Sequence, residues 1–465
     1  MKASFQHIIK LRLIFAIFIS QLFLSCKKFV DIQPPPTQIQ TSQIFENDQS
    51  ANSAIAGLYK RLIINNSIIM NGALTKLGGL SADELVNTNS PSPDDVFRIN
   101  SIEPENSNLS GALWQPAYKN IYQANAILEG LSGAAVTDSL KRQIKGEALL
   151  VRSLNYFYLI NLFGDVPLVI ATNYKENQSL ARTPVTQIYE RITNDLLEAK
   201  ALLSTIYPSS GRVRPNKWTA TALLARVYLF QKDWSKAESQ STEIINTGTY
   251  SLTNDLTNTF LLNSPETIWS LMDDKSNTAE GQMFIPAFSF IKPGYILTDT
   301  LLNSFETGDQ RKEKWINSAD VNGLTVYYPY KYKKGYDFSS TPPVPTEYYV
   351  VFRLAELFLI RAEARAHLGD IVNSQSDINV IRNRAGLLNT SANDQSTLLS
   401  AIEQERKVEL FAEWGHRWFD LKRTDEANNK LGHLKAPNWQ NTDVLYPIPF
   451  DQIQLNPFLV QNPGY

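Results

Sequence analysis

Adjacent carboxylates are the first residues in this chain that could carry out chemistry. They occur in loop-rich stretches, at Asp83-Glu84, Asp94-Asp95 and Asp273-Asp274. Glycoside hydrolysis needs two carboxyl groups held at a defined separation. Acidic pairs in loops more often close turns, cap helices or face solvent. We therefore predict no catalytic residue here, and a surface glycosidase stays open only as an alternative.

A second set of charged residues lies in segments with helical periodicity. Its members are Glu147, Arg152, Arg406, Glu409, Glu413, Arg417 and Asp420. General acid–base catalysis uses such groups, but usually at loop-borne sites with perturbed partners. Burying an unpaired charge beside an apolar stripe would cost folding free energy. Charged side chains in such helices are therefore normally paired with charges of opposite sign. The pattern predicts a structural ion-pair network.

Other catalytic and cofactor signatures are missing from the sequence. It has four histidines without metal-ligand spacing, one cysteine, and no HExxH, nucleophile elbow or phosphate loop. The formal net charge of −2 provides no basic footprint for nucleic acid. We expect a protein that is not an enzyme, with no metal, no cofactor and no nucleic-acid partner.

Aromatic side chains provide the best functional signal. They gather in the turn-rich segment 248–346, where helical periodicity fades. Sugar rings present apolar faces that stack on aromatic rings, and a few polar groups then fix the ligand. Most such rings fill a core, so few of them would touch ligand. We predict Trp315, Tyr295 and Tyr336 as stacking residues, because each stands beside polar residues, Gly or Pro. We predict Asp83 and Asn87 as polar partners.

Helical hairpins must hold that segment in place. Residues 348–386 and 217–248 each read as two helices, with Asp370 and Asp233 capping the second helix of each pair. Small residues recur at matching offsets, as in tetratricopeptide hairpins. The fold class is therefore mostly α, with tetratricopeptide-like hairpins packed against a loop-rich, aromatic ligand-binding region.

Further elements follow from periodicity and from helix breakers. Helices are predicted over 140–163 and after Pro184, and another places Ile402, Arg406, Glu409 and Glu413 on one face. Short strands are predicted at 267–272 and 325–332.

The N-terminus has the pattern of an export signal. Lys2, Lys10 and Arg12 precede an apolar run over 13–24, and Ser25-Cys26 follows. The run is short for a membrane span and has the length of a signal-peptide core. A lone cysteine after it predicts a lipidated Cys26, although the leucine stands two residues before it instead of three. A cleaved signal peptide with an unmodified cysteine is the alternative.

The whole chain after Cys26 resembles the SusD/RagB-type nutrient-binding outer-membrane lipoproteins of the Bacteroidetes. The resemblance rests on several motifs in order. They are the stretches 146–152 and 163–168, the hairpin residues 357–366 with 377–386, Glu405-Arg406, Glu409, Glu413, Arg417-Trp418, Asp420-Leu421, Arg423, and the tail 446–457.

This resemblance implies a signal peptide at 1–25, a lipid-anchored tether at 26–40, and one SusD-like domain at 41–465 with a loop-rich insert at about 248–346. It implies a lipoprotein of the outer membrane that faces the cell exterior. Such a protein would capture oligosaccharide and pass it to a TonB-dependent, SusC-like transporter. A peptide-binding member of the same class and a purely helical scaffold are the alternatives.

Overall fold

The chain divides into a short N-terminal unit, Met1–Ile44, and a large compact unit, Phe45–Tyr465. The computed structural model describes residues 45–338 and 344–465, and only His7 of the first unit. The predicted signal peptide (1–25), Cys26 and the tether (26–40) lie outside the described residues. Within these, no helix combines the length and apolar character that crossing a membrane requires.

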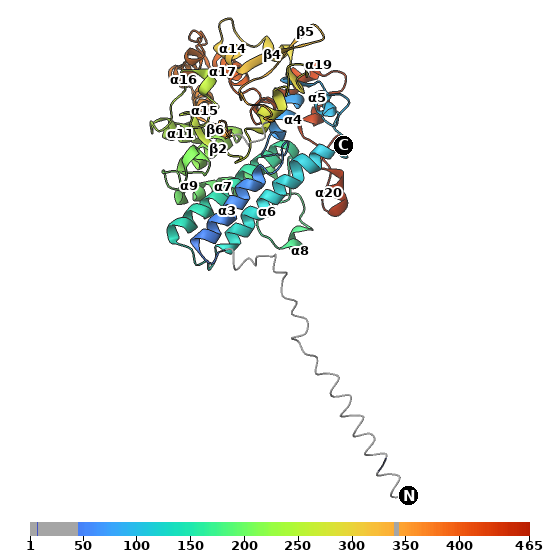
Figure 1. The fold of residues 1–465 in the computed structure, drawn as a ribbon, viewed down its shortest axis with the longest axis vertical. Coiled ribbons are helices and arrows are strands. Elements are labelled where there is room, and N and C mark those ends of the chain that lie inside the picture. Colours follow the sequence, from blue (N-terminus) through green and yellow to red (C-terminus); the bar gives the residue numbers. More distant parts are fainter. Residues whose placement is uncertain (1–6, 8–44, 339–343) are drawn as a thin grey trace. The chain divides into compact units, whose positions relative to one another are not determined.

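A continuous stack of helices forms the scaffold, as expected for the mostly α fold class. In contact order they are α3 (Asp48–Leu62), α6 (Gln115–Gly130), α7 (Asp138–Phe163), α9 (Val185–Leu202), α10 (Lys217–Phe230), α11 (Trp234–Ile245), α15 (Leu354–His367), α16 (Ile371–Arg384) and α17 (Gln395–Glu409). Figure 1 shows α3, α6 and α7 side by side at one end. Helix α11 packs directly on α15, although about a hundred residues separate them in the sequence. The chain between the two helices therefore leaves the stack after α11 and returns to it at α15.

The two predicted hairpins are confirmed as the pairs α10–α11 and α15–α16. The Asp233 carboxylate accepts from the Lys236 backbone N–H at 3.2 Å, and Asp370 accepts from Asn373 at 3.4 Å. Gly386 ends the second hairpin at φ 79°, a left-handed conformation that glycine adopts at little cost. Helices α7 and α9 also match their predictions, and α9 begins directly after Pro184.

Shorter elements fill the segments between these helices. The helices are α4 (Ala73–Ser81), α5 (Asp95–Ile99), α8 (Tyr174–Asn177), α12 (Ala279–Phe284), α13 (Asp299–Leu302), α14 (Gln310–Trp315), α18 (His416–Arg423), α19 (Ala427–Leu434) and α20 (Phe450–Leu455). A π-helical turn spans Leu109–Trp114, and 3₁₀ turns span Ser210–Arg212, Leu256–Asn258 and Asn441–Val444.

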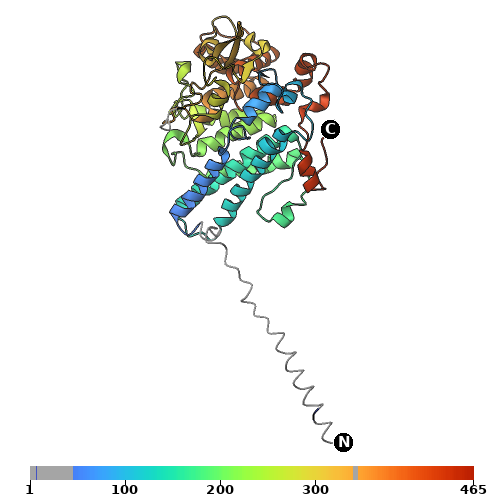
Figure 2. The ribbon, with the colours of Figure 1, turned by 45° about the vertical axis from the view of Figure 1, so that its right-hand side comes forward.

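In the part of the chain that the structure describes, six strands form three antiparallel pairs. They are β1 (Leu85–Asn87) with β3 (Tyr295–Leu297), β2 (Thr267–Leu271) with β6 (Tyr349–Arg353), and β4 (Ile316–Val321) with β5 (Leu324–Pro329). The strands predicted at 267–272 and 325–332 correspond to β2 and β5. In both views the yellow hairpin β4–β5 lies at the end of this unit remote from α3 and α6 (Figures 1 and 2).

Two helix predictions are wrong at their ends. Residues 349–353 form strand β6 instead of the first turns of α15, because the first four are β-branched or aromatic and the whole strand is buried against β2. Glu413 does not continue α17, which ends at Glu409. The chain turns there through Gly415, whose backbone packs closely on Gly78 of α4.

The buried charges form the predicted ion-pair network. Arg353 at the end of β6 is paired with Glu266, Glu409 and Glu413 at 2.9, 2.6 and 2.8 Å. The other charges predicted from the sequence are paired as well: Arg152 with Asp195, Glu147 with Arg214, Arg406 with Asp420, and Arg417 with Asp83. These charges therefore join helices and strands of the core.

Candidate ligand-binding site

Four aromatic rings form a row on the surface of the segment between α11 and α15. In order they are Phe290, Phe288, Phe338 and Tyr336. Neighbouring ring centroids lie 5.4, 5.2 and 6.0 Å apart, with interplanar angles of 5°, 9° and 23°. Their exposed fractions are 83, 48, 64 and 54% in the same order. We call this row the aromatic platform; Phe290 and Tyr336 stand at its two ends and each stacks on one ring of the row.

Such a row differs from the aromatic core of the protein. Large side chains that stay exposed together on a soluble protein usually mark an interaction site. Offset stacking between neighbours holds each ring in place. The platform therefore presents ordered apolar ring surface to solvent, with little conformational entropy left to lose on binding.

The first half of the platform is a turn tied to strands β1 and β3. The Ile291 backbone N–H donates to the Phe288 carbonyl at 3.0 Å and closes the turn. The Lys292 ammonium donates to the Thr88 carbonyl at 2.5 Å, and the Thr88 N–H donates to the Gly294 carbonyl at 3.0 Å. Because Thr88 and Gly294 extend the β1–β3 pair, the sheet sets the position of Phe288 and Phe290.

The second half is held by a buried carboxylate. Glu347 is 1% exposed, and it accepts from the backbone N–H groups of Lys333 and Lys334 at 2.6 and 3.1 Å. Burial raises the pKa of Glu347, and these two N–H groups act in the opposite direction by stabilising its charged form. The carboxylate thus fixes the chain immediately before Tyr336.

Close backbone packing holds the same segment against α12. A Cβ atom on Gly281 would overlap the Lys334 carbonyl oxygen, and a Cβ on Gly335 would lie 3.1 Å from the Cβ of Ile285. Glycine at these positions lets residues 334–335 approach α12. The two halves of the platform can therefore meet.

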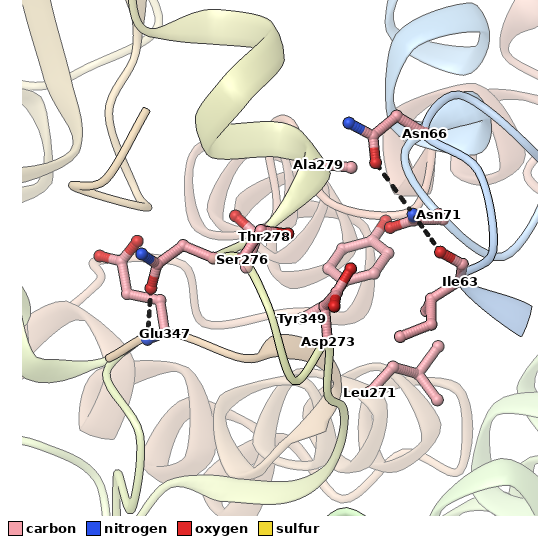
Figure 3. A pocket seen from close by; sticks show the side chains of 11 residues that line it. Ile63, Asn66, Asn71, Leu271, Asp273, Ser276, Thr278, Ala279, Glu347 and Tyr349 are labelled. Atoms are coloured by element: carbon pink, nitrogen blue, oxygen red, sulfur yellow. Dashed lines mark hydrogen bonds between the residues drawn. The ribbon is translucent and has the colours of Figure 1, made fainter. Parts of the chain in front are cut away.

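A small pocket lies beside Glu347, between β6 and α12. Figure 3 shows Tyr349, Thr278 and Ala279 around it, and Asn71 hydrogen-bonded to Asn66 and to the Ile63 carbonyl. The pocket measures about 10 Å³, which is room for about one water molecule. It is part of the support beneath the site and is too small for a sugar ring.

The structure brings two of the predicted ligand-binding residues together. Asn87 and Tyr295 are register partners across the β1–β3 pair. The Asn87 amide donates to Ser92 and Asp95, both at 2.8 Å, and the Tyr295 hydroxyl donates to Asp94 at 2.5 Å. Both side chains organise the loop after β1. Their contact with a ligand stays a prediction.

Asp83 directs its carboxylate to a different place. It pairs with Arg417 at 2.8 Å and Lys407 at 3.1 Å, and these cations hold the pKa of Asp83 well below its usual range against the effect of burial. The three side chains line a separate charged cavity of about 450 Å³ with Glu403 and Lys430. The Asp83 carboxylate therefore already has two cationic partners within the protein.

Trp315 does not lie in a loop, contrary to the sequence prediction. It is the last residue of α14 and is 0% exposed. Its indole N–H donates to the Leu256 carbonyl at 2.9 Å, and the Lys331 ammonium lies 4.7 Å from its ring. No face of the ring reaches solvent, so Trp315 fills the core of the insert.

Tyr336 belongs to the platform, whereas Phe288, Phe290 and Phe338 were not among the predicted site residues. The expectation that phenylalanine is buried works against them. One sequence signal does point to the turn: Phe288 and Phe290 stand two residues apart, flanked by Pro286 and Pro293. Alternate aromatic residues between prolines are a poor fit to a buried helix or central strand.

Two further predictions concern metal binding and the lipid anchor. Within residues 45–338 and 344–465, no group of three or more His, Cys, Asp or Glu side chains could hold a metal ion. Cys26, the predicted lipidation site, lies outside the described residues.

Comparison with known proteins gives two family matches along the chain. A model described as the SusD family matches residues 303–465. A model described as "Starch-binding associating with outer membrane" matches residues 29–229. SusD-like protein P25 of Formosa agariphila is 26% identical to this chain, over 95% of the chain and 97% of its own length.

Solved structures show the same fold. A SusD superfamily protein of Bacteroides vulgatus matches with a TM-score of 0.79 and 22% identity, over 90% of this chain and 99% of its own. A structure titled "Laminarin binding SusD-like protein" matches with a TM-score of 0.77 and 24% identity, over 90% of this chain and 100% of its own.

Proposed function

This chain belongs to the SusD family, and from that membership we propose that it binds glycans and captures oligosaccharide on the aromatic platform. The single observation that carries this site is the row of four exposed, stacked rings. The C–H face of one sugar ring stacks on Phe290 or on Tyr336, while hydroxyl groups bond to polar groups at the edge.

Two exposed polar residues lie on the segments that tie the first half of the platform to β1 and β3. Lys292 follows the turn directly and is exposed, with one of its donors bonded to Thr88. Asn89 is exposed, and its amide nitrogen would lie 3.3 Å from a Cβ on Gly294. An amide both donates and accepts, which suits hydroxyl groups. The names of related proteins mention starch and laminarin, and both are our first choices of ligand.

We further propose that the protein is anchored to the outer membrane through a lipid on Cys26 and faces the cell exterior. It passes its glycan to a TonB-dependent, SusC-like transporter. The family description that mentions association with an outer membrane supports this placement. The role is capture without bond cleavage, because the carboxylates of Glu409, at the end of α17, and Glu413, in the turn that follows, are committed to ion pairs with Arg353.

A peptide-binding protein of the same uptake class is the competing function. Exposed phenylalanines could also receive apolar side chains of a peptide. A titration of the chain from residue 27 onward, which keeps the whole unit Phe45–Tyr465, separates the two. Oligosaccharides from starch and from laminarin are compared with a mixed peptide pool by calorimetry.

Three tyrosine variants locate the site in the same titration. If stacking binds the glycan, Tyr336→Ala weakens binding about tenfold, the effect of losing about 1.4 kcal/mol, whereas Tyr336→Phe keeps it. Tyr174→Ala is the control, because Tyr174 is 67% exposed on α8 and outside the platform. Glycan binding that Tyr336→Ala leaves unchanged would contradict the platform, and binding of peptides alone would contradict the glycan.

A further inference from the structure

A pocket larger than the two described above lies among helices of the scaffold. It has a volume of about 720 Å³ and is bordered by α6, α8, α20 and the chain after α7. Its volume falls within the roughly 300–1,000 Å³ typical of small-molecule sites. No residue of the aromatic platform lines it. Figure 1 shows α6, α8 and α20, which come from distant parts of the sequence.

Three aromatic residues form one wall of this pocket. Trp114, Tyr118 and Tyr122 are spaced four residues apart, so they share one face as the π-helical turn passes into α6. The Trp114 and Tyr118 rings lie 5.1 Å apart, and the Tyr118 hydroxyl donates to the Pro167 carbonyl at 2.8 Å. These contacts fix the inner two rings. Tyr122, at the outer end, is 50% exposed.

Amide side chains dominate the polar part of the lining. They are Gln115, Asn177, Gln178, Gln452 and Asn456. Each amide offers both donors and an acceptor, and hydroxyl groups likewise donate and accept. Gln178 is exposed, and its amide nitrogen has one long contact with the Lys175 carbonyl at 3.4 Å. Gln178 therefore lines the pocket as an exposed amide.

The charged groups near the pocket are few. No carboxylate is among its lining residues, which include Arg61 and Lys119. Asp451 lies on the same helix as Gln452, and its Oδ2 accepts from Ser110, Gln115 and Gln452 at 2.6, 3.2 and 3.0 Å. With this carboxylate satisfied by protein donors, the lining is mainly aromatic and uncharged polar.

We propose that this pocket is a second saccharide-binding site, which takes a short neutral segment of glycan against Tyr122. Aromatic faces with uncharged amides suit a ligand that has apolar C–H faces and many hydroxyl groups. A purely apolar ligand would remove the exposed Gln178 amide from water without offering it a partner, which disfavours a lipid. This proposal assumes that the ligand is a carbohydrate, as proposed above. It does not require the aromatic platform to be a binding site.

The test compares four forms of the chain from residue 27 onward. They are the wild type, the pocket variant Tyr122→Ala/Gln178→Ala, the platform variant Phe290→Ala/Tyr336→Ala, and the control Tyr174→Ala. All substituted side chains are exposed, so each variant should keep the fold. Each protein is titrated by calorimetry with short oligosaccharides from starch and from laminarin. Amide hydrogen exchange of residues 115–122 is followed with and without the saccharide.

We expect two sites per chain in the wild type and in the control, and one in each double variant. Exchange at 115–122 should slow with saccharide in the platform variant and stay unchanged in the pocket variant. A pocket variant with wild-type stoichiometry and affinity would overturn the second site, as would a platform variant that binds nothing. A platform variant that keeps wild-type stoichiometry, beside a pocket variant that loses a site, would contradict the platform and leave the pocket standing.

Discussion

Phe290 is 83% exposed and Trp315 is 0% exposed, so truncation of the two side chains should have opposite effects. Phe290→Ala should weaken glycan binding about tenfold or more while the unfolding free energy changes by less than about 0.5 kcal/mol. Trp315→Ala should lower the unfolding free energy by about 3–5 kcal/mol, because it leaves a large cavity. Calorimetric titration and urea denaturation of both variants check the pair. A Phe290→Ala protein that unfolds easily would show that this ring is structural.

This contrast marks what residue types alone could not decide. Composition predicts that the segment 248–346 carries the ligand-binding rings, and Tyr336 lies on the platform. Exposure of a ring depends on tertiary contacts: Trp315 closes a short helix over Leu256, whereas Phe290 sits in a turn tied to β1 and β3. Neither contact has a local sequence signal. The exposed aromatic row was therefore predictable as a region and only partly as individual residues, and its contact with a ligand stays a prediction.

Glu84 gives the fold a testable pH dependence. Burial and the neighbouring Asp83 carboxylate raise the pKa of Glu84 from 4.5 to about 8, and its Oε1 has no hydrogen-bond partner among the described residues. A carboxyl group whose pKa is higher in the folded state contributes stability that is complete below 4.5 and is lost as the pH rises through about 8. The loss is on the order of a few kcal/mol, since each pKa unit corresponds to about 1.4 kcal/mol.

Glu84→Gln removes this loss because glutamine stays neutral. The unfolding free energy of the variant should exceed that of the wild type by a margin that grows as the pH rises from 4.5 to about 8. Urea denaturation at a series of pH values measures the margin. Glu103→Gln, at an exposed position, serves as the control and should show no such trend. A margin for Glu84→Gln that is the same at every pH would contradict a neutral, buried Glu84.

At the scale of elements, Gly281 of α12 is the position where the backbone of the platform's second half comes closest to a helix. Gly281→Ala would place a methyl group against the Lys334 carbonyl, so residues 334–338 must shift. We expect weaker glycan binding by several-fold and a loss of about 1–3 kcal/mol in unfolding free energy. Titration and urea denaturation measure both effects.

Gly57→Ala is the matched control for this element. Gly57 lies inside α3, and a Cβ there would meet nothing within 4 Å. Alanine should raise the unfolding free energy by about 0.5–1 kcal/mol and leave glycan binding unchanged. Gly281→Ala with unchanged affinity would mean that the position of Tyr336 and Phe338 does not matter for the ligand.

The predictability of the elements follows the same physics. Helices with an amphipathic stripe and a side-chain cap, such as α11 behind Asp233 and α16 behind Asp370, were predictable because their signals are local. Strand β6 was not, because Val351 continues the helical spacing of α15 while its neighbours Val350 and Phe352 pair with β2. The break between α17 and α18 depends on the contact of Gly415 with Gly78, which lies far away in sequence.

For the whole molecule, the proposed lipid on Cys26 predicts where the protein is found in a cell. The wild-type protein should incorporate a labelled fatty acid and sediment with the outer membrane. Cys26→Ser removes the thiol that would carry the lipid, so this variant should lose the label and leave the membrane fraction. Label retained by Cys26→Ser, or a wild-type protein without label, would contradict the anchor and favour a cleaved signal peptide with an unmodified cysteine.

The central claim is that the protein binds glycan on the aromatic platform, and a crystal structure of the chain from residue 27 onward with a bound oligosaccharide tests it most directly. We predict a sugar ring packed face to face on Phe290 or Tyr336, with carbon atoms within about 4.5 Å of the aromatic ring. An oligosaccharide bound entirely elsewhere, with all four platform rings facing solvent, would contradict the claim.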